Sequence, residues 1–337
     1  MNILLTGGAG YIGSHTAVVL AHAGHNVVLL DNFSNSSPEV IERLEKILQS
    51  SLQSPLAFIE ADVRDTEKLK QVLNEHQIDA VIHFAGLKAV GESVAKPIEY
   101  YANNIQGTIS LLQAMSSTNV KKLVFSSSAT VYGDPQYLPI DEEHPLKATN
   151  PYGRSKLHIE EILSDVARSD KDWRINCLRY FNPVGAHESG LIGENPRGMP
   201  NNLMPFVMQV AAGKQAELKI FGNDYSTRDG TGVRDYIHVM DLAEGHKAAL
   251  DFLDKEFGWH AINLGTGNGY SVMEILKMFE TTNNKVVPFT VTKRRDGDIA
   301  ECYANPEKAK NTLHWTARHS LADMCASGWK YQSQLQN

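Results

Sequence analysis

The chain opens with MNILLTGGAGYIGSH (residues 1–15), a short apolar run that leads into a glycine-rich turn and then into an apolar-periodic stretch. This order predicts a β-strand, a tight turn and an α-helix whose N-terminus opens onto the turn. Glycines let the backbone approach a ligand closely, and the free N–H groups of a helix N-terminus favour a pyrophosphate. The spacing of Gly7, Gly10 and Gly13 is GxxGxxG rather than GxGxxG, and a plain strand–helix turn would explain it equally well.

An acidic residue strengthens the ligand-binding interpretation. A second apolar run, residues 26–30, ends at Asp31, eighteen residues after Gly13. A carboxylate at that strand end can accept hydrogen bonds from the adenosine ribose hydroxyls and repels a 2′-phosphate. The pattern therefore favours a bound dinucleotide, and NAD rather than NADP.

Strands and helices alternate over the first half of the chain. We expect further strands at 56–60, 80–86, 123–128 and 174–180, with a helix over 68–75. Alternation of this kind is typical of an α/β fold, here a Rossmann-type doubly wound parallel sheet with helices on both faces. Ligands in such sheets bind beyond the carboxyl ends of the strands, where six residues of the chain fall: Gly7, Asp31, Asp62, Gly86, Ser128 and Asn182.

The composition changes after about residue 181. Residues 182–205 are rich in Gly, Pro and Asn, and candidate strands at 218–221 and 286–291 predict a smaller mixed α/β C-terminal domain. We expect an NAD-binding Rossmann domain over 1–181 and a substrate-binding domain over 182–337. The segment 235–252 is expected to return to the first domain.

Charge and composition exclude several classes of protein. A net charge of −7 argues against nucleic acid as the main partner, because binding phosphates needs a clustered positive surface. Three scattered cysteines are too few for a disulfide framework or a zinc site, so no metal is expected. No apolar stretch approaches 18 residues and no signal segment precedes the first strand. We expect a cytoplasmic protein with no membrane partner.

Tyr152 and Lys156 form a candidate catalytic pair. They lie four residues apart, about one helical turn, so both side chains project from the same face of a helix. A lysine ammonium beside a phenol favours the phenolate and lowers its pKa, which would make the tyrosine a usable base near neutral pH. The same spacing also occurs on many solvated helix faces.

Longer motifs resemble a known family. The chain is similar to the extended short-chain dehydrogenases/reductases, and more narrowly to the UDP-glucose 4-epimerase (UDP-galactose 4-epimerase) family, over essentially its whole length. Two matching blocks are common to that superfamily, TGGAGYIGSH (6–15) and SSSATVYG (126–133). Three point to the epimerases, HFAGLKAVGES (83–93), PNNLMP (200–205) and DGTGVRDYIH (229–238), and LRYFNPVGA (178–186) also matches.

The resemblance implies inversion of carbon 4 in UDP-glucose or UDP-galactose through a 4-keto sugar. The resemblance implies that hydride passes from carbon 4 to tightly bound NAD, which leaves a planar ketone with no configuration at that carbon. The keto sugar then turns about its pyrophosphate linkage, and hydride returns to its other face. The resemblance makes Tyr152 the base and makes Lys156 a partner that lowers the phenol pKa and binds the nicotinamide ribose. Ser128 would relay a hydrogen bond between the sugar oxygen and Tyr152.

The resemblance also implies two sets of ligand contacts. The cofactor would meet Gly7, Gly10, Tyr11, Ile12, Gly13, Asp31, Asn32, Asp62, Val63, Phe84, Ala85, Gly86, Lys88, Asn103, Tyr152, Lys156 and Tyr180. The UDP-sugar would meet Ser128, Asn182, Asn202, Leu203, Lys219, Ile220, Phe221, Arg234, Arg295, Asp298 and Cys302. Two separated arginines suit a diphosphate because guanidinium groups match phosphate oxygens.

One position departs from the pattern of bacterial relatives. Cys302 stands where they often carry a bulky tyrosine. A smaller side chain would let the sugar pocket admit a 2-acetamido group, so we expect N-acetylated UDP-hexosamines to be substrates as well. An ordinary buried cysteine is the alternative.

Three other functions are known for chains of this kind, and the residues after Ser128 distinguish two of them from an epimerase. A nucleotide-sugar 4,6-dehydratase places an acid pair directly after the catalytic Ser/Thr, whereas this chain has Ala129 and Thr130, which cannot transfer protons at neutral pH. A UDP-glucuronate decarboxylase usually keeps a glutamate in that stretch. A non-catalytic NAD-sensing protein commonly lacks the Tyr-x-x-x-Lys pair. The epimerase is favoured over all three.

The resemblance further predicts a homodimer. In the family, two helices from each subunit form a four-helix contact, and the corresponding helices here are expected near 98–115 and 152–166. Apolar residues that could serve there, or could equally pack on the sheet, are Ile105, Leu111, Leu112, Ile159 and Leu163.

Overall fold

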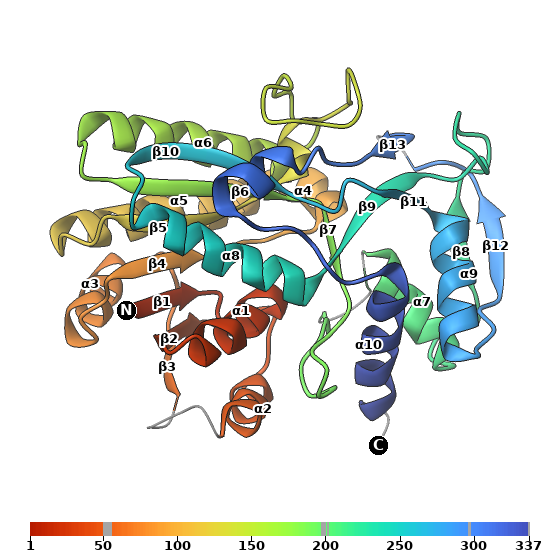
Figure 1. Ribbon diagram of the computed structural model, residues 1–337, viewed down its shortest axis with the longest axis horizontal. Helices are drawn as coiled ribbons and strands as arrows, with labels where there is room; N and C mark the ends of the chain where they lie inside the picture. The colour runs from red at the N-terminus through yellow and green to blue at the C-terminus, as the bar shows by residue number, and fades with distance from the viewer. Residues whose placement is uncertain (50–55, 197–199, 201, 296–297, 336–337) are drawn as a thin grey trace.

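The computed structural model describes residues 1–49, 56–196, 200, 202–295 and 298–335. A large parallel sheet dominates one side of the molecule (Figure 1). Its order is β10-β6-β5-β4-β1-β2-β3, made of β1 (Asn2–Thr6), β2 (Asn26–Asp31), β3 (Ala57–Glu60), β4 (Ala80–His83), β5 (Lys122–Ser128), β6 (Arg174–Tyr180) and β10 (Gly258–Leu264). The predicted doubly wound α/β fold is confirmed.

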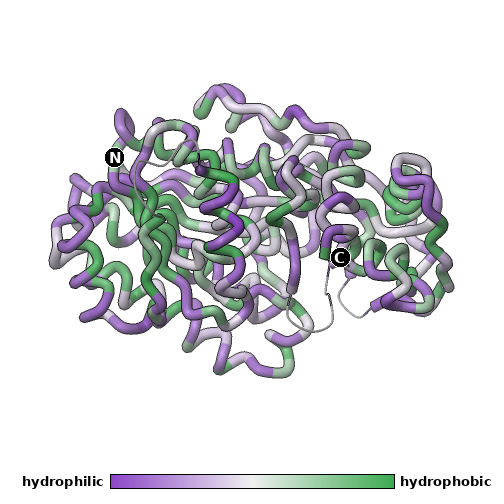
Figure 2. Tube along the Cα trace, turned by 90° about the horizontal axis from the view of Figure 1, so that it is seen from below, coloured by the Kyte–Doolittle hydropathy of each residue, from purple (hydrophilic) through white to green (hydrophobic). Residues whose placement is uncertain are grey.

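Helices cover both faces of this sheet because its strands are apolar on both sides. Leu5 of β1 lies in a core with α1 (Tyr11–His22), α2 (Glu39–Leu48) and α8 (Val239–Leu253). Leu4, the neighbouring residue, points to the opposite core with α3 (Thr66–Glu75), α5 (Pro97–Ser117) and α6 (Pro151–Ser169). Successive residues of a strand face opposite sides, so a continuous apolar run suits a sheet buried on both faces. Figure 2 shows apolar segments gathered inside this part.

Smaller sheets form the other side of the molecule. β7 (Asn182–Val184), β9 (Val233–His238), β11 (Gly269–Ser271) and β13 (Glu301–Cys302) form one sheet, and β8 (Leu218–Phe221) pairs in parallel with β12 (Phe289–Thr292). A third core packs β7, β8 and β9 against α7 (Leu203–Ala211), α9 (Val272–Asn283) and α10 (Leu321–Gln334). The short helix α4 (Val90–Ala95), a 3₁₀ turn (Ala129–Val131) and a π-helical turn (Ala309–Leu313) complete the elements.

The chain crosses between the two sides more than once. From β9 it enters α8, which packs against α1, and it continues into β10. β10 pairs in parallel with β6 in the large sheet, in the register Ala261↔Cys177. The sequence pattern did not indicate this strand, which lies beyond the segment expected to return. No helix in the described part of the chain is long and apolar enough to cross a lipid bilayer.

Candidate active site

The glycine-rich turn between β1 and α1 is packed too tightly for side chains. Gly7 has φ +69°, and a Cβ there would lie 2.7 Å from the backbone nitrogen of Ala85; at Gly13 it would lie 2.4 Å from the Gly7 carbonyl oxygen. At Gly10, the N-cap of α1, a Cβ would meet only the Gly7 oxygen among the described residues, and no described side chain caps the helix. The helix N-terminus therefore keeps donors for an anionic group.

Asp31 binds this turn to the end of β2. Its Oδ2 accepts from the Ala9 N–H at 3.0 Å, while Oδ1 accepts from the Phe33 N–H and the Ser36 hydroxyl, both at 2.9 Å. An ionised carboxylate offers about four acceptor positions, so capacity remains for a ribose hydroxyl.

The next predicted cofactor contacts lie beside Asp31. Asn32 Nδ2 donates to Asp62 Oδ2 at 3.2 Å, and Arg64 pairs with the same carboxylate at 2.7 Å. Hydrogen bonds from Arg64 lower the pKa of Asp62 to about 2. Val63 is buried against α5, where a Cβ on Gly107 would lie 2.7 Å from Val63 Cγ1.

Ser128 and Tyr152 come together at the carboxyl end of β5. Ser128 caps the following 3₁₀ turn, and its Oγ accepts from the Thr130 N–H at 3.2 Å and from the Thr130 hydroxyl at 3.0 Å. Tyr152 lies in the first turn of α6, whose N-cap Asn150 accepts from the Gly153 N–H at 2.9 Å. Burial raises the pKa of Tyr152, and a hydrogen bond with the Ser128 side chain opposes that rise.

Lys156 lies one turn further along α6 and is buried. Its Nζ donates to the Ser126 carbonyl at 2.6 Å and lies 6.0 Å from the Tyr152 ring centroid. Burial lowers the pKa of Lys156 to about 8. Burial thus raises the pKa of the Tyr152 phenol, and the Lys156 ammonium donates to a backbone carbonyl. That Lys156 lowers the Tyr152 pKa stays a prediction.

The loop after β4 supplies another group of expected cofactor contacts. Phe84, Ala85 and Gly86 follow β4 directly, and a Cβ on Gly86 would lie 3.2 Å from Asn104 Oδ1. The structure brings Asn104 against this loop, while the predicted contact Asn103 is half-buried on α5. Across the sheet, Tyr180 ends β6, and its hydroxyl lies 3.2 Å from His246 Nε2.

Lys88 ends the same loop, and its partner was not predicted. Its Nζ lies 3.0 Å from Glu194 Oε1, and Asn202, a predicted substrate contact, donates to the same oxygen at 2.8 Å. Asn202 is also the N-cap residue of α7, which begins at Leu203. Glu194 belongs to an irregular segment, and no local pattern identified it.

Further substrate contacts gather around β9. Arg234 of β9 is aligned with Cys302 of β13, and its Nη2 lies 3.9 Å from Asp298 Oδ1. Cys302 is 9% exposed, and burial raises its pKa to about 11. Asn182 begins β7 opposite Tyr236 of β9. Asn182, Arg234 and Cys302 share one sheet although they are far apart in the sequence.

The strand β8 carries the remaining group. Ile220 faces the core, whereas Lys219 is exposed and Phe221 is half-buried on the opposite side of the strand. The Arg295 guanidinium carbon lies 3.8 Å from the Phe221 ring centroid. Residue 201, in the motif at 200–205, lies outside the described part of the chain, as do residues 296 and 297, between the expected contacts Arg295 and Asp298.

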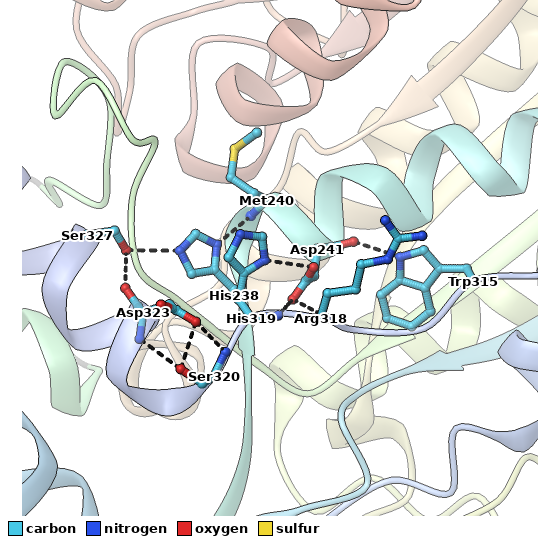
Figure 3. A network of polar contacts seen from close by, with 9 residues as sticks. All are labelled: His238, Met240, Asp241, Trp315, Arg318, His319, Ser320, Asp323 and Ser327. Atoms are coloured by element: carbon cyan, nitrogen blue, oxygen red, sulfur yellow. Dashed lines mark hydrogen bonds and ion pairs between the residues drawn. The ribbon is translucent and has the colours of Figure 1, made fainter.

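A histidine and a serine are also in contact at the start of α8, away from Tyr152 (Figure 3). His238 Nε2 lies 2.9 Å from Ser327 Oγ, and its Nδ1 accepts from the Met240 N–H at 3.1 Å. The proton of neutral His238 is therefore on Nε2 and is donated to Ser327, whose hydroxyl donates to the Asp323 carbonyl. A histidine in this tautomer cannot remove the serine proton, so the contact is structural.

A second histidine stacks on the first. The His319 and His238 rings are 4.3 Å apart, and His319 Nδ1 lies 2.9 Å from Asp241 Oδ1. This network joins the start of α8 to the segment before α10. No group of three potential metal-ligating His, Cys, Asp or Glu side chains occurs in the described ranges.

Comparisons with known proteins agree with this geometry. A family model described as GDP-mannose 4,6 dehydratase matches residues 4–327. The UDP-glucose 4-epimerase of Bacillus subtilis (strain 168) is 57% identical, over 100% of this chain and 98% of the relative. The chain belongs to the UDP-glucose 4-epimerase family.

Solved structures of UDP-glucose 4-epimerases superpose over the full chain. One from Stenotrophomonas maltophila, with bound NAD and formylated UDP-arabinopyranose, has a TM-score of 0.97 at 50% identity and covers 100% of this chain and 99% of that chain. One from Bifidobacterium longum, in complex with NAD⁺ and UDP, has a TM-score of 0.95 at 52% identity, with the same coverage. The predicted family resemblance is confirmed.

Proposed function

We propose that the protein interconverts UDP-glucose and UDP-galactose by inverting carbon 4 through a transient 4-keto sugar, with tightly bound NAD. The observation that carries this proposal is the placement of Tyr152, in the first turn of α6, close enough to Ser128 at the carboxyl end of β5 for the Ser128 side chain to oppose the rise in the Tyr152 pKa, in a chain 57% identical to a UDP-glucose 4-epimerase. The glycine-rich turn and the Asp31 carboxylate fit the cofactor, because they combine a close backbone approach with an acceptor at the end of β2.

The chain itself supplies proton transfer at the 4-hydroxyl oxygen. The chemistry that bound NAD would supply is reversible hydride acceptance from carbon 4, together with a positive charge that favours the Tyr152 phenolate. Tyr152 takes the hydroxyl proton and later returns it, and Ser128, whose Oγ accepts two hydrogen bonds from Thr130, directs its own proton toward the reacting oxygens. A ketone at carbon 4 is planar, so the configuration is lost and hydrogen can return to either face.

We assign the two ligands to the two sides of the molecule. The cofactor contacts named above lie at or just after the ends of β1, β2, β3, β4 and β6 of the large sheet or on α1, α5 and α6, which supports residues 1–181 as the NAD-binding part. The substrate contacts other than Ser128 lie on β7, α7, β8, β9 and β13 and in the segment between β12 and β13, which supports residues 182–337 as the UDP-sugar-binding part. Two elements of this second range, α8 and β10, pack with the large sheet.

Cys302 extends the proposed substrate range. It lies beside Val131, Phe181 and Ala304, in a cluster next to the 3₁₀ turn that follows Ser128. A thiol there occupies much less volume than a phenol. We therefore include UDP-N-acetylglucosamine and UDP-N-acetylgalactosamine as substrates.

Association as a homodimer is also proposed, through α4 and the start of α5. Leu111, Leu112, Ile159 and Leu163 are buried against the protein's own sheet and are not available for a partner. Val94 and Ile98 are 64% and 82% exposed on neighbouring helices, which supports an interface there. Light scattering at micromolar concentration should give twice the chain mass, and I98E should reduce it to one chain; a monomer mass for the unaltered protein would refute the dimer.

The three cysteines are free and buried, which suits a protein of the reducing cytoplasm.

The proposed activity is tested by incubating the purified protein with UDP-galactose, without added cofactor, and following the sugars by proton NMR. Appearance of UDP-glucose with no net change in nicotinamide absorbance supports the proposal. A stable 4-keto-6-deoxy product would establish a dehydratase instead, despite Ala129 and Thr130. Absence of conversion even after NAD is added would indicate a binding protein.

A further inference from the structure

Glu194 is a buried carboxylate between the two groups of expected ligand contacts. Its Oε1 accepts from Lys88 Nζ at 3.0 Å and from Asn202 Nδ2 at 2.8 Å. The Glu194 side chain is 6% exposed, whereas that of Lys88 is 47% exposed. The carboxylate is therefore the fixed end of this contact, and the ammonium is the end that can reach a ligand.

The backbone that carries Glu194 is held in place from two directions. The preceding residue, Gly193, forms an antiparallel β-bridge with Ala186. A Cβ on Gly193 would lie 2.4 Å from the Tyr331 ring of α10, so the backbone is pressed against that helix. The backbone before Glu194 is therefore held in place. A residue that positions other side chains needs such support.

The loop that carries Lys88 is tied to the catalytic helix. The Leu87 N–H donates to Asn104 Oδ1 at 2.8 Å, and Asn104 Nδ2 donates to the Leu87 carbonyl at 3.0 Å. Asn104 Nδ2 also lies 3.1 Å from Ser155 Oγ, and Ser155 donates to the Tyr152 carbonyl at 2.7 Å. Hydrogen bonds therefore connect Glu194 through Lys88 and its loop to the first turn of α6.

Glu194 also acts on two residues expected to bind a ligand. Asn202 is the N-cap residue of α7, yet its side chain makes no capping bond and turns to Glu194 instead. Burial, followed by the negative charge of Glu194, raises the pKa of Tyr11, a residue expected over the pyrophosphate. Glu194 thus acts on residues expected to bind the cofactor and on one expected to bind the sugar nucleotide.

We propose that Glu194 is a positioning residue for the sugar nucleotide. It orients the Asn202 amide, an expected substrate contact, and the Lys88 ammonium, an expected cofactor contact that we now place within reach of both ligands, so that their remaining N–H donors face the diphosphate end of the sugar nucleotide. Lys88 carries three donors and Asn202 carries two, so each keeps at least one for the ligand after binding Glu194. The ion pair also offsets the repulsion between a carboxylate and a diphosphate. This inference rests on the proposed function.

The test compares E194Q with the unaltered holoprotein. Glutamine keeps the size and the acceptor oxygen but removes the charge. E194Q should weaken binding of UDP, measured by titration calorimetry, and raise KM for UDP-galactose by about tenfold, the scale of one hydrogen bond to a charged group, while kcat changes less than about twofold. The matched control E188Q removes an exposed carboxylate from the same segment and should change neither value.

Unchanged UDP binding in E194Q would overturn the proposal, and tighter binding would show instead that Glu194 competes with the ligand for Lys88. Lack of turnover by the unaltered protein would instead count against the proposed function.

The variant K88M tests the contact between Lys88 and Glu194 from its exposed end. UDP binding in E194Q/K88M should be weaker than in K88M alone by clearly less than the tenfold expected of E194Q, since K88M already removes one of the two contacts of Glu194 and only the Asn202 contact remains to be lost. Multiplying effects of the two substitutions would also overturn the proposal.

Discussion

Arg179 and Glu160 form a buried ion pair behind the carboxyl end of β5. Arg179 Nη2 lies 2.6 Å from Glu160 Oε2, and both side chains are 2% exposed. Ser127 donates to the same carboxylate at 2.5 Å, and Arg179 Nη1 donates to the Tyr132 hydroxyl at 3.0 Å. Because Ser127 immediately precedes Ser128, this ion pair fixes the strand end that carries the proposed hydrogen-bond relay.

Removal of one charge from this pair should cost more stability than removal of both. E160Q leaves the Arg179 guanidinium buried without a counter-charge and should lower the free energy of unfolding by about 3–5 kcal/mol. The double variant E160M/R179M should lose less than E160Q, because no uncompensated charge remains. Urea unfolding at pH 7 measures both values. A loss below about 1 kcal/mol in E160Q would contradict the assigned role.

Tyr152 should be required for turnover and not for nucleotide binding. Y152F removes the hydroxyl that transfers the proton and should lower kcat by about 10²–10⁴-fold. UDP affinity should stay within about twofold, because Tyr152 is on α6 and the substrate-binding residues proposed for the nucleotide are on other elements. Single-turnover kinetics and calorimetry on the NAD-loaded protein give the two quantities. A loss of kcat below tenfold would assign proton transfer to another group.

The residues predicted from the sequence are those whose chemistry follows from local spacing. The turn at Gly7–Gly13 and the acid at Asp31 could be placed because strand, turn and helix periods are local. Glu194 and Arg179 could not, because their partners Lys88 and Glu160 are 106 and 19 residues away and only the packed structure brings them together. The burial that raises the pKa of Tyr152 could not be predicted for the same reason, since burial depends on the whole fold.

Stability should fall in mild acid because several histidines are buried as neutral rings. Burial lowers the pKa of His15 and His83 to about 3, and that of His238 and His246 to about 4. Their folded-state pKa values lie below the unfolded value of about 6.5, so the unfolded state binds more protons in this range. Stability is therefore full above pH 6.5 and is lost as the pH falls toward 4.

The dependence of the unfolding free energy on pH can be assigned to single histidines. Each such histidine should contribute up to about 1.4 kcal/mol per pH unit. H15Q should reduce the slope of unfolding free energy between pH 6 and pH 5 by about that amount, because His15 Nε2 has no hydrogen-bond partner among the described residues. Urea titrations at the two pH values measure it. An unchanged slope would mean that His15 does not titrate between the two states.

Cys302 should set the tolerance for a 2-acetamido group. The unaltered protein is expected to epimerise UDP-N-acetylglucosamine, and C302Y should lose this activity while it keeps UDP-galactose turnover. Cys302 is buried in a cluster with Phe181 and Val131, which leaves little room for a phenol, and we expect the larger side chain to take up space proposed for the sugar. C302S, which is similar in size, is the control and should behave as the unaltered protein. No turnover of the N-acetylated substrate by the unaltered protein would remove the proposal.

In the proposed reaction, hydrogen leaves carbon 4 and returns to it without exchange with water. UDP-galactose that carries deuterium at carbon 4 tests this directly, by incubation with the purified protein in ordinary water and analysis by NMR and mass spectrometry. We expect UDP-glucose that retains deuterium at carbon 4. UDP-glucose with hydrogen from water at that carbon would rule out the proposed hydride return.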